Sequence, residues 1–407
     1  MAGLRVGIVG GSIAGCAAAV ALSRSGHEVT VLERSPARLL SRGLGIGTQA
    51  GVFGELVRRD MIGAGFPHRP YDAPIRWVVK HRAWEPLGYV ASAVQSTAAG
   101  AVMAMHWGDL FDSLRSRVPD AAYRAGALVT GVVPGSDGAA VEVGDRTHGF
   151  DLVICADGYR SLGRRTLFPS TFPRYRGYVA WRGIFAGAVS IDHGFSRSLV
   201  RVGYPGGFGM FYEVPSQGSA RRVNWVLHLQ VADNELSEFL GPGAGETGAS
   251  LAPDMMTPGR VADLRRFTRQ SLPDAYAAMV EATPGTAIQT IYTVEVPSYS
   301  AGRVCLLGDA GSLFPPFTAS GVFKAITNAI ELAQDISGPD PLDQALGRWS
   351  ARQVAAATAV SRTAAVLEPA LIFGIPNLAD MDPADIETWV SSLPNPPGSQ
   401  TAPPTRA

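Results

Sequence analysis

The sequence lacks the features that mark several common classes of protein. Lysine plus arginine and aspartate plus glutamate are equal, at 35 each among 407 residues, and no basic run or basic-aromatic stripe occurs. The chain therefore has no electrostatic footprint for a phosphate backbone. It also has no uninterrupted apolar run of about 18 residues, the length that spans a bilayer. We expect a protein that binds neither nucleic acid nor membrane.

Cysteine is scarce, and its positions argue against a disulfide-bonded protein and against a metal-binding one. Cys16, Cys155 and Cys305 stand in small or apolar surroundings without metal-ligand spacing. We expect buried, reduced thiols in a cytoplasmic protein, and no metal site. The apolar stretch after Arg5 is interrupted by glycines, so a strand-turn-helix pattern explains it better than a signal peptide.

What the chain has near its start is a glycine-rich turn between two apolar strands. Strands are predicted at Leu4–Val9 and Glu28–Leu32, with an alanine-rich helix between them. In such a βαβ unit Gly10 allows the tight turn, Gly15 allows close helix packing, and the helix N-terminus meets a pyrophosphate. Glu33 can accept a hydrogen bond from a ribose hydroxyl, while an empty structural βαβ unit is the alternative. The residues expected to contact a dinucleotide, with Ser12 in place of the middle glycine, are Gly10, Ser12, Ile13, Ala14, Gly15, Glu33 and Arg34.

A second glycine-rich stretch, the loop 42–48, leads into a predicted helix at Gly51–Arg59. Its glycines permit a ligand to approach the backbone, and Arg42 offers a charge to a phosphate or a carboxylate. The alternative is a flexible connector with a solvated arginine. Arg164 and Arg165 leave a similar choice open between a phosphate and solvent.

Two later strands end in an aspartate beside a glycine. A buried strand ends at Asp157-Gly158. The strand Val304–Leu307 runs into Gly308-Asp309, and a turn containing Pro316 and a helix that begins at Gly321 follow. Asp309 can accept hydrogen bonds from a polyol, and Pro316 can form a wall for a planar ring. The helix N-terminus suits a ring carbonyl or a developing anion. An ordinary strand-loop-helix unit with a capping aspartate is the alternative.

From Tyr178 to about Thr283 the pattern changes to alternating strands separated by glycine and proline turns. This pattern indicates a mainly antiparallel sheet inserted between two parts of a nucleotide-binding domain. The strand Thr286–Val296 is expected to return the chain to the first domain, and the Pro-, Ser- and Thr-rich tail to be disordered. The predicted division is residues 1–72, 98–177 and 285–360 for the nucleotide-binding domain, 73–97 and 178–284 for the sheet domain, 361–393 for a C-terminal helical segment and 394–407 for the tail.

Three motifs, GGSIAG with Glu33, CADGYRS and GDAGSLFPPFTASG, occur in this order and resemble those of the class A flavin monooxygenases, which have the para-hydroxybenzoate hydroxylase fold. The resemblance covers roughly residues 4–360. The stretches GYVAWRG, RRVNW and FGIP are similar to the 2,6-dihydroxypyridine 3-hydroxylase branch. The implied fold class is α/β, with a Rossmann-like FAD-binding domain, an inserted and mainly antiparallel substrate sheet, and C-terminal helices.

By this resemblance the chain binds FAD, with the ADP part on the first βαβ unit and Asp309 near the ribityl chain. The amides of Gly321 and Val322 lie at the flavin pyrimidine ring, and Asp157 lies near the nicotinamide and the flavin. NADPH or NADH supplies a hydride, O2 gives a flavin 4a-hydroperoxide, and an electron-rich aromatic or heteroaromatic small molecule is hydroxylated. The ring, the nicotinamide nucleotide and the oligomeric state, a homodimer included, stay open.

Some positions depart from the family's pattern. The family usually has histidine where Ser312 stands, asparagine near Phe323, aspartate where Asn328 stands and arginine where Trp107 stands. Because the first three positions flank the flavin, we expect a pocket of a different shape.

Candidate catalytic residues come from the sheet strands and the proline turn. His228 and Tyr212 can activate a ring hydroxyl, Pro316 can support the flavin, and a structural role is the alternative for each. Arg182 and Tyr204 are neighbours that can point at the same cavity. Two other functions are considered: a tailoring flavoenzyme of secondary metabolism, by epoxidation, Baeyer-Villiger oxidation or halogenation, and a non-catalytic FAD-binding module. The chain lacks the Trp-x-Trp-x-Ile-Pro stretch of flavin halogenases.

Overall fold

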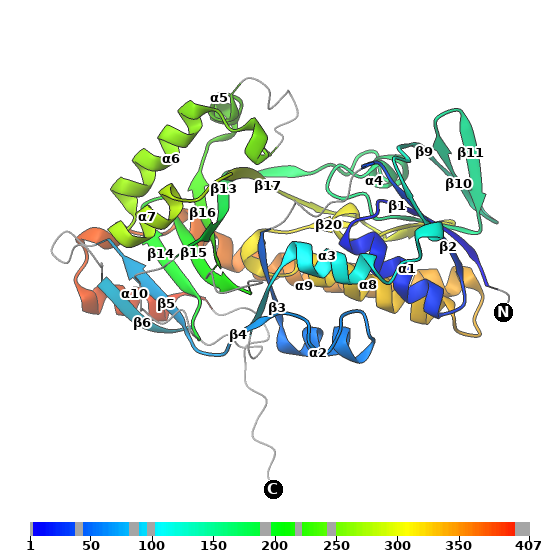
Figure 1. Ribbon diagram of the computed structural model, residues 1–407, viewed down its shortest axis with the longest axis horizontal. Coiled ribbons are helices and arrows are strands. Elements are labelled where there is room, and N and C mark those ends of the chain that lie inside the picture. The colour runs from blue at the N-terminus through cyan, green and yellow to red at the C-terminus, as the bar shows by residue number, and fades with distance from the viewer. Residues whose placement is uncertain are drawn as a thin grey trace, which may run out of the picture.

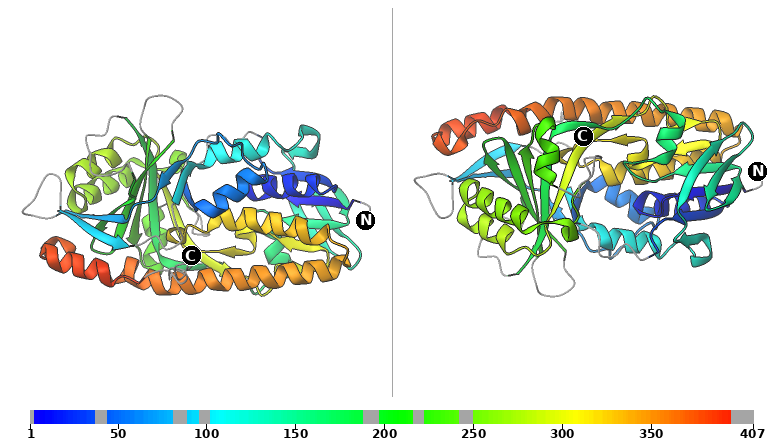
Figure 2. Two further views of the ribbon diagram at one scale, coloured as in Figure 1. Left: turned by 90° about the horizontal axis from the view of Figure 1, so that it is seen from below. Right: turned by 90° about the horizontal axis from the view of Figure 1, so that it is seen from above.

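The computed structural model describes residues 3–36, 44–80, 89–95, 102–187, 197–215, 222–241 and 250–394. The chain forms two lobes, with the N-terminal βαβ unit in one and long antiparallel strands in the other (Figure 1). The helix α9 (Leu342–Glu368) runs along one side of both lobes (Figure 2). Arg42 and the tail from residue 395 lie outside the described residues.

The first lobe is organised around a mostly parallel sheet with the strand order β18-β19-β12-β1-β2-β8. Its strands are β1 (Arg5–Val9), β2 (Glu28–Glu33), β8 (Tyr123–Ala125), β12 (Leu152–Cys155), β18 (Ser300–Ala301) and β19 (Val304–Leu306). β1 pairs in parallel with β2 and β12, and β12 pairs in parallel with β19. The carboxyl ends of these strands therefore share one edge, which brings the turns that follow β1, β12 and β19 together.

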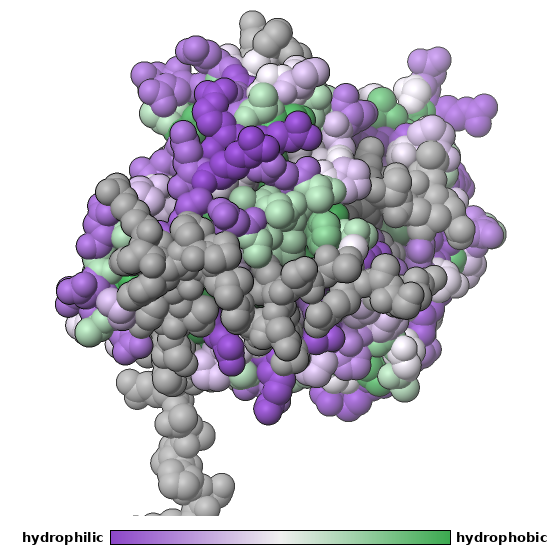
Figure 3. Space-filling model, turned by 60° about the vertical axis from the view of Figure 1, so that its left-hand side comes forward, coloured by the Kyte–Doolittle hydropathy of each residue, from purple (hydrophilic) through white to green (hydrophobic). Residues whose placement is uncertain are grey.

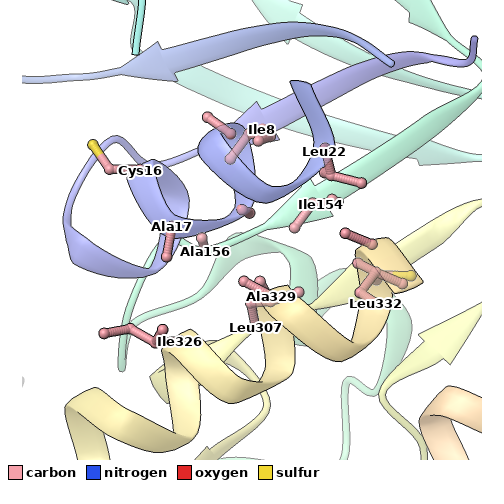
Figure 4. Close-up of a cluster of buried hydrophobic side chains, with 14 of the residues drawn as sticks. Ile8, Cys16, Ala17, Leu22, Ile154, Ala156, Leu307, Ile326, Ala329 and Leu332 are labelled. Carbon is pink, nitrogen blue, oxygen red and sulfur yellow. The ribbon is translucent and has the colours of Figure 1, made fainter. Parts of the chain in front are cut away.

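Alanine and glycine let helices pack closely on this sheet. α1 (Ile13–Arg24) lies against α8 (Gly321–Ile336), and the contact includes Ala17 and Ala329, both fully buried (Figure 4). The other helices of this lobe are α2 (Ala50–Arg58), α3 (Trp107–Arg115) and α4 (Leu162–Leu167). The predicted buried thiols are confirmed: all three cysteines are free and buried.

Two small sheets complete the first lobe. The antiparallel meander predicted near residues 129–143 is β9 (Val129–Pro134), β10 (Ala139–Val143) and β11 (Arg146–Phe150). The second small sheet has the order β3 (Gly45–Gln49), β7 (Val102–His106), β4 (Arg69–Tyr71). The glycine-rich stretch expected as a loop is thus partly a strand, because Gly45–Gln49 finds an antiparallel partner in β7.

The second lobe is an eight-stranded sheet with the order β20-β17-β13-β16-β15-β14-β5-β6. Its strands are β5 (Ile75–Val79), β6 (Tyr89–Gln95), β13 (Arg174–Ala186), β14 (Val200–Tyr204), β15 (Gly207–Val214), β16 (Arg222–Gln230), β17 (Ala287–Glu295) and β20 (Ser312–Leu313). All its pairs are antiparallel except β14 with β5. The strand expected to return to the first domain is β17, which pairs with β13 in this sheet.

The two faces of this sheet have different neighbours. Trp181 and Trp225 lie on the face covered by α5 (Leu236–Leu240), α6 (Pro258–Ser271) and α7 (Asp274–Glu281). On the opposite face, Trp77 and Phe208 pack against α10 (Pro383–Ser392) and the π-helical turn Pro369–Phe373. The remainder of that opposite face approaches β3 of the first lobe through Asn224.

The long C-terminal helix links the lobes through its buried side chains. Leu346 and Trp349 are buried where α9 packs on α8. Within the described residues, the helix Leu342–Phe373 has the length and mean hydropathy of a membrane span, and 33% of that window is buried. The core helix of a soluble protein passes the same test.

Figure 3 shows one face on which apolar side chains gather in a patch beneath a hydrophilic region.

Candidate active site

Two glycines at the turn after β1 and the start of α1 stand where no larger residue fits. Gly10 has a φ of +97°, and a Cβ there would lie 2.5 Å from the carbonyl oxygen of Ala156. A Cβ on Gly15 would lie 1.9 Å from the carbonyl oxygen of Gly10. Ser12 is the N-cap of α1 and its side chain makes no cap bond, so the first N–H groups of the helix keep no intrahelical partner. These donors and the helix dipole suit a diphosphate.

Glu33 stabilises this turn from the end of β2. One carboxylate oxygen accepts a hydrogen bond from the backbone N–H of Gly11 at 2.7 Å, and the other from that of Ser35 at 2.8 Å. The residue is 7% exposed, whereas Arg34 beside it is exposed. Each carboxylate oxygen has a second lone pair, so contact with a ribose hydroxyl stays a prediction.

One carboxylate oxygen of Asp157 accepts hydrogen bonds, and the other has no partner among the described residues. Oδ2 accepts from the backbone N–H groups of Leu162 at 2.6 Å and Gly163 at 3.4 Å, which fixes the start of α4. Oδ1 is buried and has no hydrogen-bond partner among the described residues. A buried acceptor of this kind is costly unless a ligand donates to it.

Of the two roles that the sequence left open for Arg164, the structure rules out a solvated side chain, and contact with a phosphate stays a prediction. Arg164 is 1% exposed, and its guanidinium donates to the carbonyl oxygens of Asp309 at 3.1 Å and Ala310 at 3.0 Å, and to that of Tyr159. Burial lowers the pKa of this guanidinium. The side chain therefore ties the turn after β12 to the turn after β19. Arg165 is exposed and donates to the carbonyl oxygen of Arg160 at 2.7 Å.

The turn after β19 lies directly beneath α8. Gly308 has a φ of +58°, and a Cβ there would lie 2.9 Å from Ala325 and 3.5 Å from Ala14. Burial raises the pKa of the Asp309 carboxyl, and the nearby charges of Lys324 and Arg164 oppose that shift. The exposed N-terminal residue of α8, Gly321, has no heavy atom within 4 Å of the place of a Cβ, and Val322 is half-buried. Main chain at this helix end is therefore open to a ligand.

These features fit the cofactor that the motifs imply. The glycine turn, the unused Oδ1 of Asp157 and the Asp309 carboxyl lie along one edge of the parallel sheet. Thr48 on β3 adds a hydroxyl that is 2% exposed and has no hydrogen-bond partner in the described part of the chain. The hydroxyl groups of an extended dinucleotide would donate to the unpaired acceptor oxygens, and its diphosphate would accept from the free N–H groups of the glycine turn.

The sheet side of the site is joined to the nucleotide side at Gly45. The Oδ1 of Asn224 accepts from the backbone N–H of Gly45 at 2.7 Å, and a Cβ on Gly45 would clash with Asn224 and Tyr212. Arg182 donates to Gln289 Oε1 at 2.8 Å and to the carbonyl oxygen of Gly45 at 3.5 Å. Its Nε is buried with no hydrogen-bond partner, and no described carboxylate forms an ion pair with it.

Tyr212 shares this face because it stands opposite Asn224 in the β15–β16 ladder. The side chain is half-buried, and burial raises the pKa of its hydroxyl to about 12, although Arg182 and Asn224 act to lower it. The phenol is therefore protonated at neutral pH and can donate a hydrogen bond. Its catalytic role stays a prediction, and the structure places it next to Arg182 and Gly45.

His228 lies on the same face but at its closed end. It is 1% exposed, its ring stacks on Phe208 with centroids 4.5 Å apart, and its Nδ1 lies 3.1 Å from the carbonyl oxygen of Phe208. Nε2 has no partner in the described structure. Burial lowers the pKa of the imidazole to about 4, so it is neutral near pH 7 and is a weak base. A catalytic role for His228 stays a prediction, and hydrogen-bond acceptance at Nε2 is the form that its surroundings allow.

Pro316 begins a short 3-10 turn, Pro316–Thr318, between β20 and α8. A groove of about 460 Å³ opens beside this turn and is lined by Phe314, Pro315, Phe172, Arg174 and Glu368, among others. Phe172 is 63% exposed. The structure thus places Pro316 between Asp309 and the N-terminus of α8, and its contact with a flavin stays a prediction.

The departures from the family's pattern have structural explanations. Asn328 accepts from the backbone N–H of Gly308 at 3.2 Å and donates to Gln353 at 2.6 Å. An ionised aspartate could make the first of these hydrogen bonds but could not donate in the second. Phe323 is 5% exposed and belongs to the core of the first lobe. Trp107 stacks on Phe111 with ring centroids 5.5 Å apart.

Three residues that the structure brings into the site were not predicted from the sequence: Asn224, Gln289 and Thr48. Each is an isolated polar residue on a strand. Only the register of strands far apart in sequence shows that Asn224 and Gln289 share one face, and Thr48 lies on β3 of a different sheet. Among the residues described here, no group of three or more His, Cys, Asp or Glu is placed to hold a metal ion.

Comparisons with known proteins agree with this geometry. A model described as an NAD(P)-binding Rossmann-like domain matches residues 8–37, and one described as FAD binding domain-like matches residues 175–293. Aurachin C monooxygenase/isomerase from Stigmatella aurantiaca is 30% identical over 357 residues, which is 86% of this chain and 85% of the relative. The 2,6-dihydroxypyridine 3-monooxygenase of Paenarthrobacter nicotinovorans is 27% identical over 401 residues, or 92% and 96% of the two chains.

The fold is also that of a solved structure. The 2,6-dihydroxypyridine-3-hydroxylase from Arthrobacter nicotinovorans has a TM-score of 0.81 against this chain at 22% identity. The match covers 93% of this chain and 95% of the other. This likeness confirms the predicted α/β fold with an inserted, mainly antiparallel sheet.

Proposed function

Because this chain belongs to the class A FAD-dependent aromatic monooxygenases, we propose that it hydroxylates an electron-rich aromatic or heteroaromatic ring that carries an acidic oxygen. The family members are oxidoreductases that use FAD, NAD(P)H and O2. Bound FAD supplies the redox chemistry, which is uptake of a hydride and transfer of one oxygen atom from O2 to the ring. The residues that would hold it are those of the glycine turn, Glu33, Asp157, Asp309 and the N-terminus of α8.

The observation that carries the proposal is the position of Arg182. Its guanidinium lies beside Gly45 on the open part of the sheet face, with a buried Nε that no described group satisfies. A phenolate, a pyridinolate or a carboxylate would accept hydrogen bonds from it. The charge of Arg182 would also lower the pKa of a ring hydroxyl, and the ionised ring is the better nucleophile.

Tyr212 and Asn224 would orient the ring beside Arg182. The hydroxyl of Tyr212 is protonated at neutral pH and can donate, and the Nδ2 of Asn224 is buried without a partner in the described chain. Three donors around one position favour a substrate rich in acceptor oxygens. Met210, opposite Val226 on the same face, adds an apolar side chain against which a ring can lie.

The closed end of the same face would exclude water. His228, Phe208 and Trp77 are buried there beneath the C-terminal helices. A dry surround strengthens the hydrogen bonds of Arg182 and would limit the loss of activated oxygen to water.

We also propose that the groove beside Pro315 receives the nicotinamide nucleotide. The match to an NAD(P)-binding Rossmann-like domain lies on the βαβ unit that would hold FAD, so NAD(P)H needs a different surface. The groove offers the exposed ring of Phe172 for stacking and the exposed guanidinium of Arg174 for a phosphate, and Pro315 of the turn that would support the flavin lines it.

The test uses the purified protein loaded with FAD and a panel of aromatic compounds. Salicylate, 6-hydroxynicotinate and 2,6-dihydroxypyridine, the compounds in the names of relatives, start the panel, each beside its methyl ether. We expect a compound with a free acidic oxygen to stimulate NAD(P)H oxidation and to give a product that contains one atom from isotope-labelled O2. Equal stimulation by the ethers would contradict a role for the ring hydroxyl as the acidic oxygen, and a protein that takes up no FAD would contradict the whole proposal. A cytoplasmic location, a homodimer and the absence of membrane binding stay predictions.

A further inference from the structure

Lys324 is a lysine enclosed between the two elements that would hold the flavin. It lies in the first turn of α8, and its Nζ donates to the Oγ of Ser312 at 3.0 Å and to the carbonyl oxygen of the same residue. Nζ also lies 5.0 Å from the centre of the Phe314 ring. No described carboxylate forms an ion pair with it, so its hydrogen-bond partners in the described chain are neutral.

A second residue holds this arrangement in place. The hydroxyl of Tyr299 shares a hydrogen bond with the Oγ of Ser312, and both residues are fully buried. The serine stands where the family usually has histidine, and its small side chain leaves Nζ of Lys324 room to reach the main chain of β20. Lys324 is half-buried as a whole, and its ammonium is therefore held against β20 by neutral oxygens instead of extending freely into solvent as surface lysines do.

The charge of this group persists at neutral pH. Burial lowers the pKa of Lys324 to about 8, and the negative charge of Asp309 opposes that shift. An ammonium held in protein costs desolvation free energy that neutral partners repay only in part. A negative charge that forms in this site during the reaction would therefore be stabilised by a cation already in place.

We propose that Lys324 supplies the positive charge that favours the reduced, anionic form of the bound FAD. Transfer of a hydride from NAD(P)H gives NAD(P)+ and a flavin with two more electrons, one more hydrogen and one negative charge, so atoms and charge balance. A nearby cation stabilises this product more than the neutral oxidised ring. The inference rests on the proposed function, because it requires FAD at the N-terminus of α8 and the Pro316 turn.

The test measures the two-electron midpoint potential of the FAD-loaded protein by equilibration with a reference dye, without substrate. In K324M we expect the preference for reduced over oxidised flavin to fall about tenfold, which is about 30 mV for a two-electron couple. K324R keeps a charge and should stay within about threefold of the wild type. S312A is the matched control, because it removes one hydrogen bond from Nζ and leaves the charge in place.

Each outcome decides the matter. A K324M potential equal to that of the wild type would overturn the proposal, and so would an S312A shift as large as that of K324M, since geometry would then be responsible. If K324M does not retain FAD, K324Q takes its place, and if neither neutral variant retains it, K324R decides. A wild-type potential in K324R supports a role through charge, and a tenfold shift contradicts one. Failure of the wild-type chain to bind FAD would instead refute the proposed function.

Discussion

The two sides of the site are built from different parts of the chain. On the nucleotide side the ligand would meet main chain, because Gly10, Gly15 and Gly308 stand where a Cβ would lie within 3.0 Å of a neighbouring atom. On the sheet side the ligand would meet side chains, among them Arg182 on β13 and Tyr212 on β15, the strands on either side of β16. The nucleotide side therefore depends on glycines that have no Cβ, and the sheet side depends on the functional groups of its side chains.

This difference predicts how each side fails. Adding a methyl group should damage the nucleotide side, where the main chain must approach the ligand and its own neighbours. Removing a functional group should damage the sheet side, where a donor or a stacked ring would be lost. The predictions below test this contrast, in order of decreasing effect.

The largest effect is expected for G15A. The added Cβ would lie 1.9 Å from the carbonyl oxygen of Gly10, so the turn that would hold the diphosphate must move. Overpacking of this kind costs about 1–3 kcal/mol, and displacement of the turn adds to it. We expect the affinity for FAD to fall by more than about 100-fold, measured by titration of flavin fluorescence.

A matched glycine gives the control. Gly51 in α2 has no heavy atom within 4 Å of the place of a Cβ, and alanine is the better helix former. G51A should bind FAD like the wild type and should be slightly more stable. Equal loss of FAD in both variants would show that the turn has no special need of glycine.

The nucleotide side could be predicted from the sequence because its signals are local. Gly10, Gly15 and Glu33 lie within one strand-turn-helix-strand unit, and residues this close in sequence meet through geometry that hardly varies. The prediction failed where tertiary contacts decide. Gly45–Gln49 became a strand through pairing with β7, and Arg164 was drawn inside by carbonyl oxygens of a segment 145 residues away.

The sheet side could be predicted only in outline, as an antiparallel insertion. Which residues face the site depends on register, and a slip of one residue moves a side chain to the other face. Tyr212 and His228 were both predicted for the site from strand position, and both share its face. Their different burial follows from the C-terminal helices, which cover one end of that face and leave the other open, and nothing near either residue in the sequence shows this.

The second largest effect is expected for H228N and concerns stability against acid. The pKa of His228 is about 4 in the folded chain against 6.5 in a solvated histidine. Between these values the unfolded chain binds more protons, so folding stability falls as the pH is lowered from 6.5 toward 4. The loss amounts to about 3 kcal/mol at most.

Asparagine cannot take up the proton, and its amide can donate to the carbonyl oxygen of Phe208 as Nδ1 can. H228N should therefore show a flatter dependence on pH in urea denaturation across this window. Parallel profiles for H228N and wild type would contradict the buried, neutral state of His228. A large loss of turnover at neutral pH, with substrate affinity kept, would show that Nε2 also contacts the reacting ring.

The next effect sharpens the contrast at the open end of the same face. R182M removes the guanidinium that would hold an acidic oxygen, and a hydrogen bond to a charged group contributes about 2 kcal/mol, or roughly 30-fold in affinity. We expect substrate binding to weaken by about that factor while FAD binding stays unchanged, as measured by substrate-induced change in the flavin spectrum. Y212F is the comparison variant, and it should weaken binding less because it removes a neutral donor. A loss of FAD in R182M would show that side chains of the sheet hold the cofactor as well.

The smallest effect is expected at the groove beside Pro315, where the two sides meet. If a side chain holds the nicotinamide nucleotide there, R174Q should raise the NAD(P)H concentration needed for half-maximal flavin reduction about fivefold, since a partly solvated arginine-phosphate contact contributes about 1 kcal/mol. Rapid mixing without O2 measures this rate, and reduction by dithionite should be unchanged because it needs no nucleotide site. R165Q is the control, because Arg165 is an exposed arginine outside the groove lining. An equal effect of R165Q would indicate general charge attraction. No effect of R174Q would mean that main chain holds this nucleotide too, and binding by side chains would then be confined to the substrate.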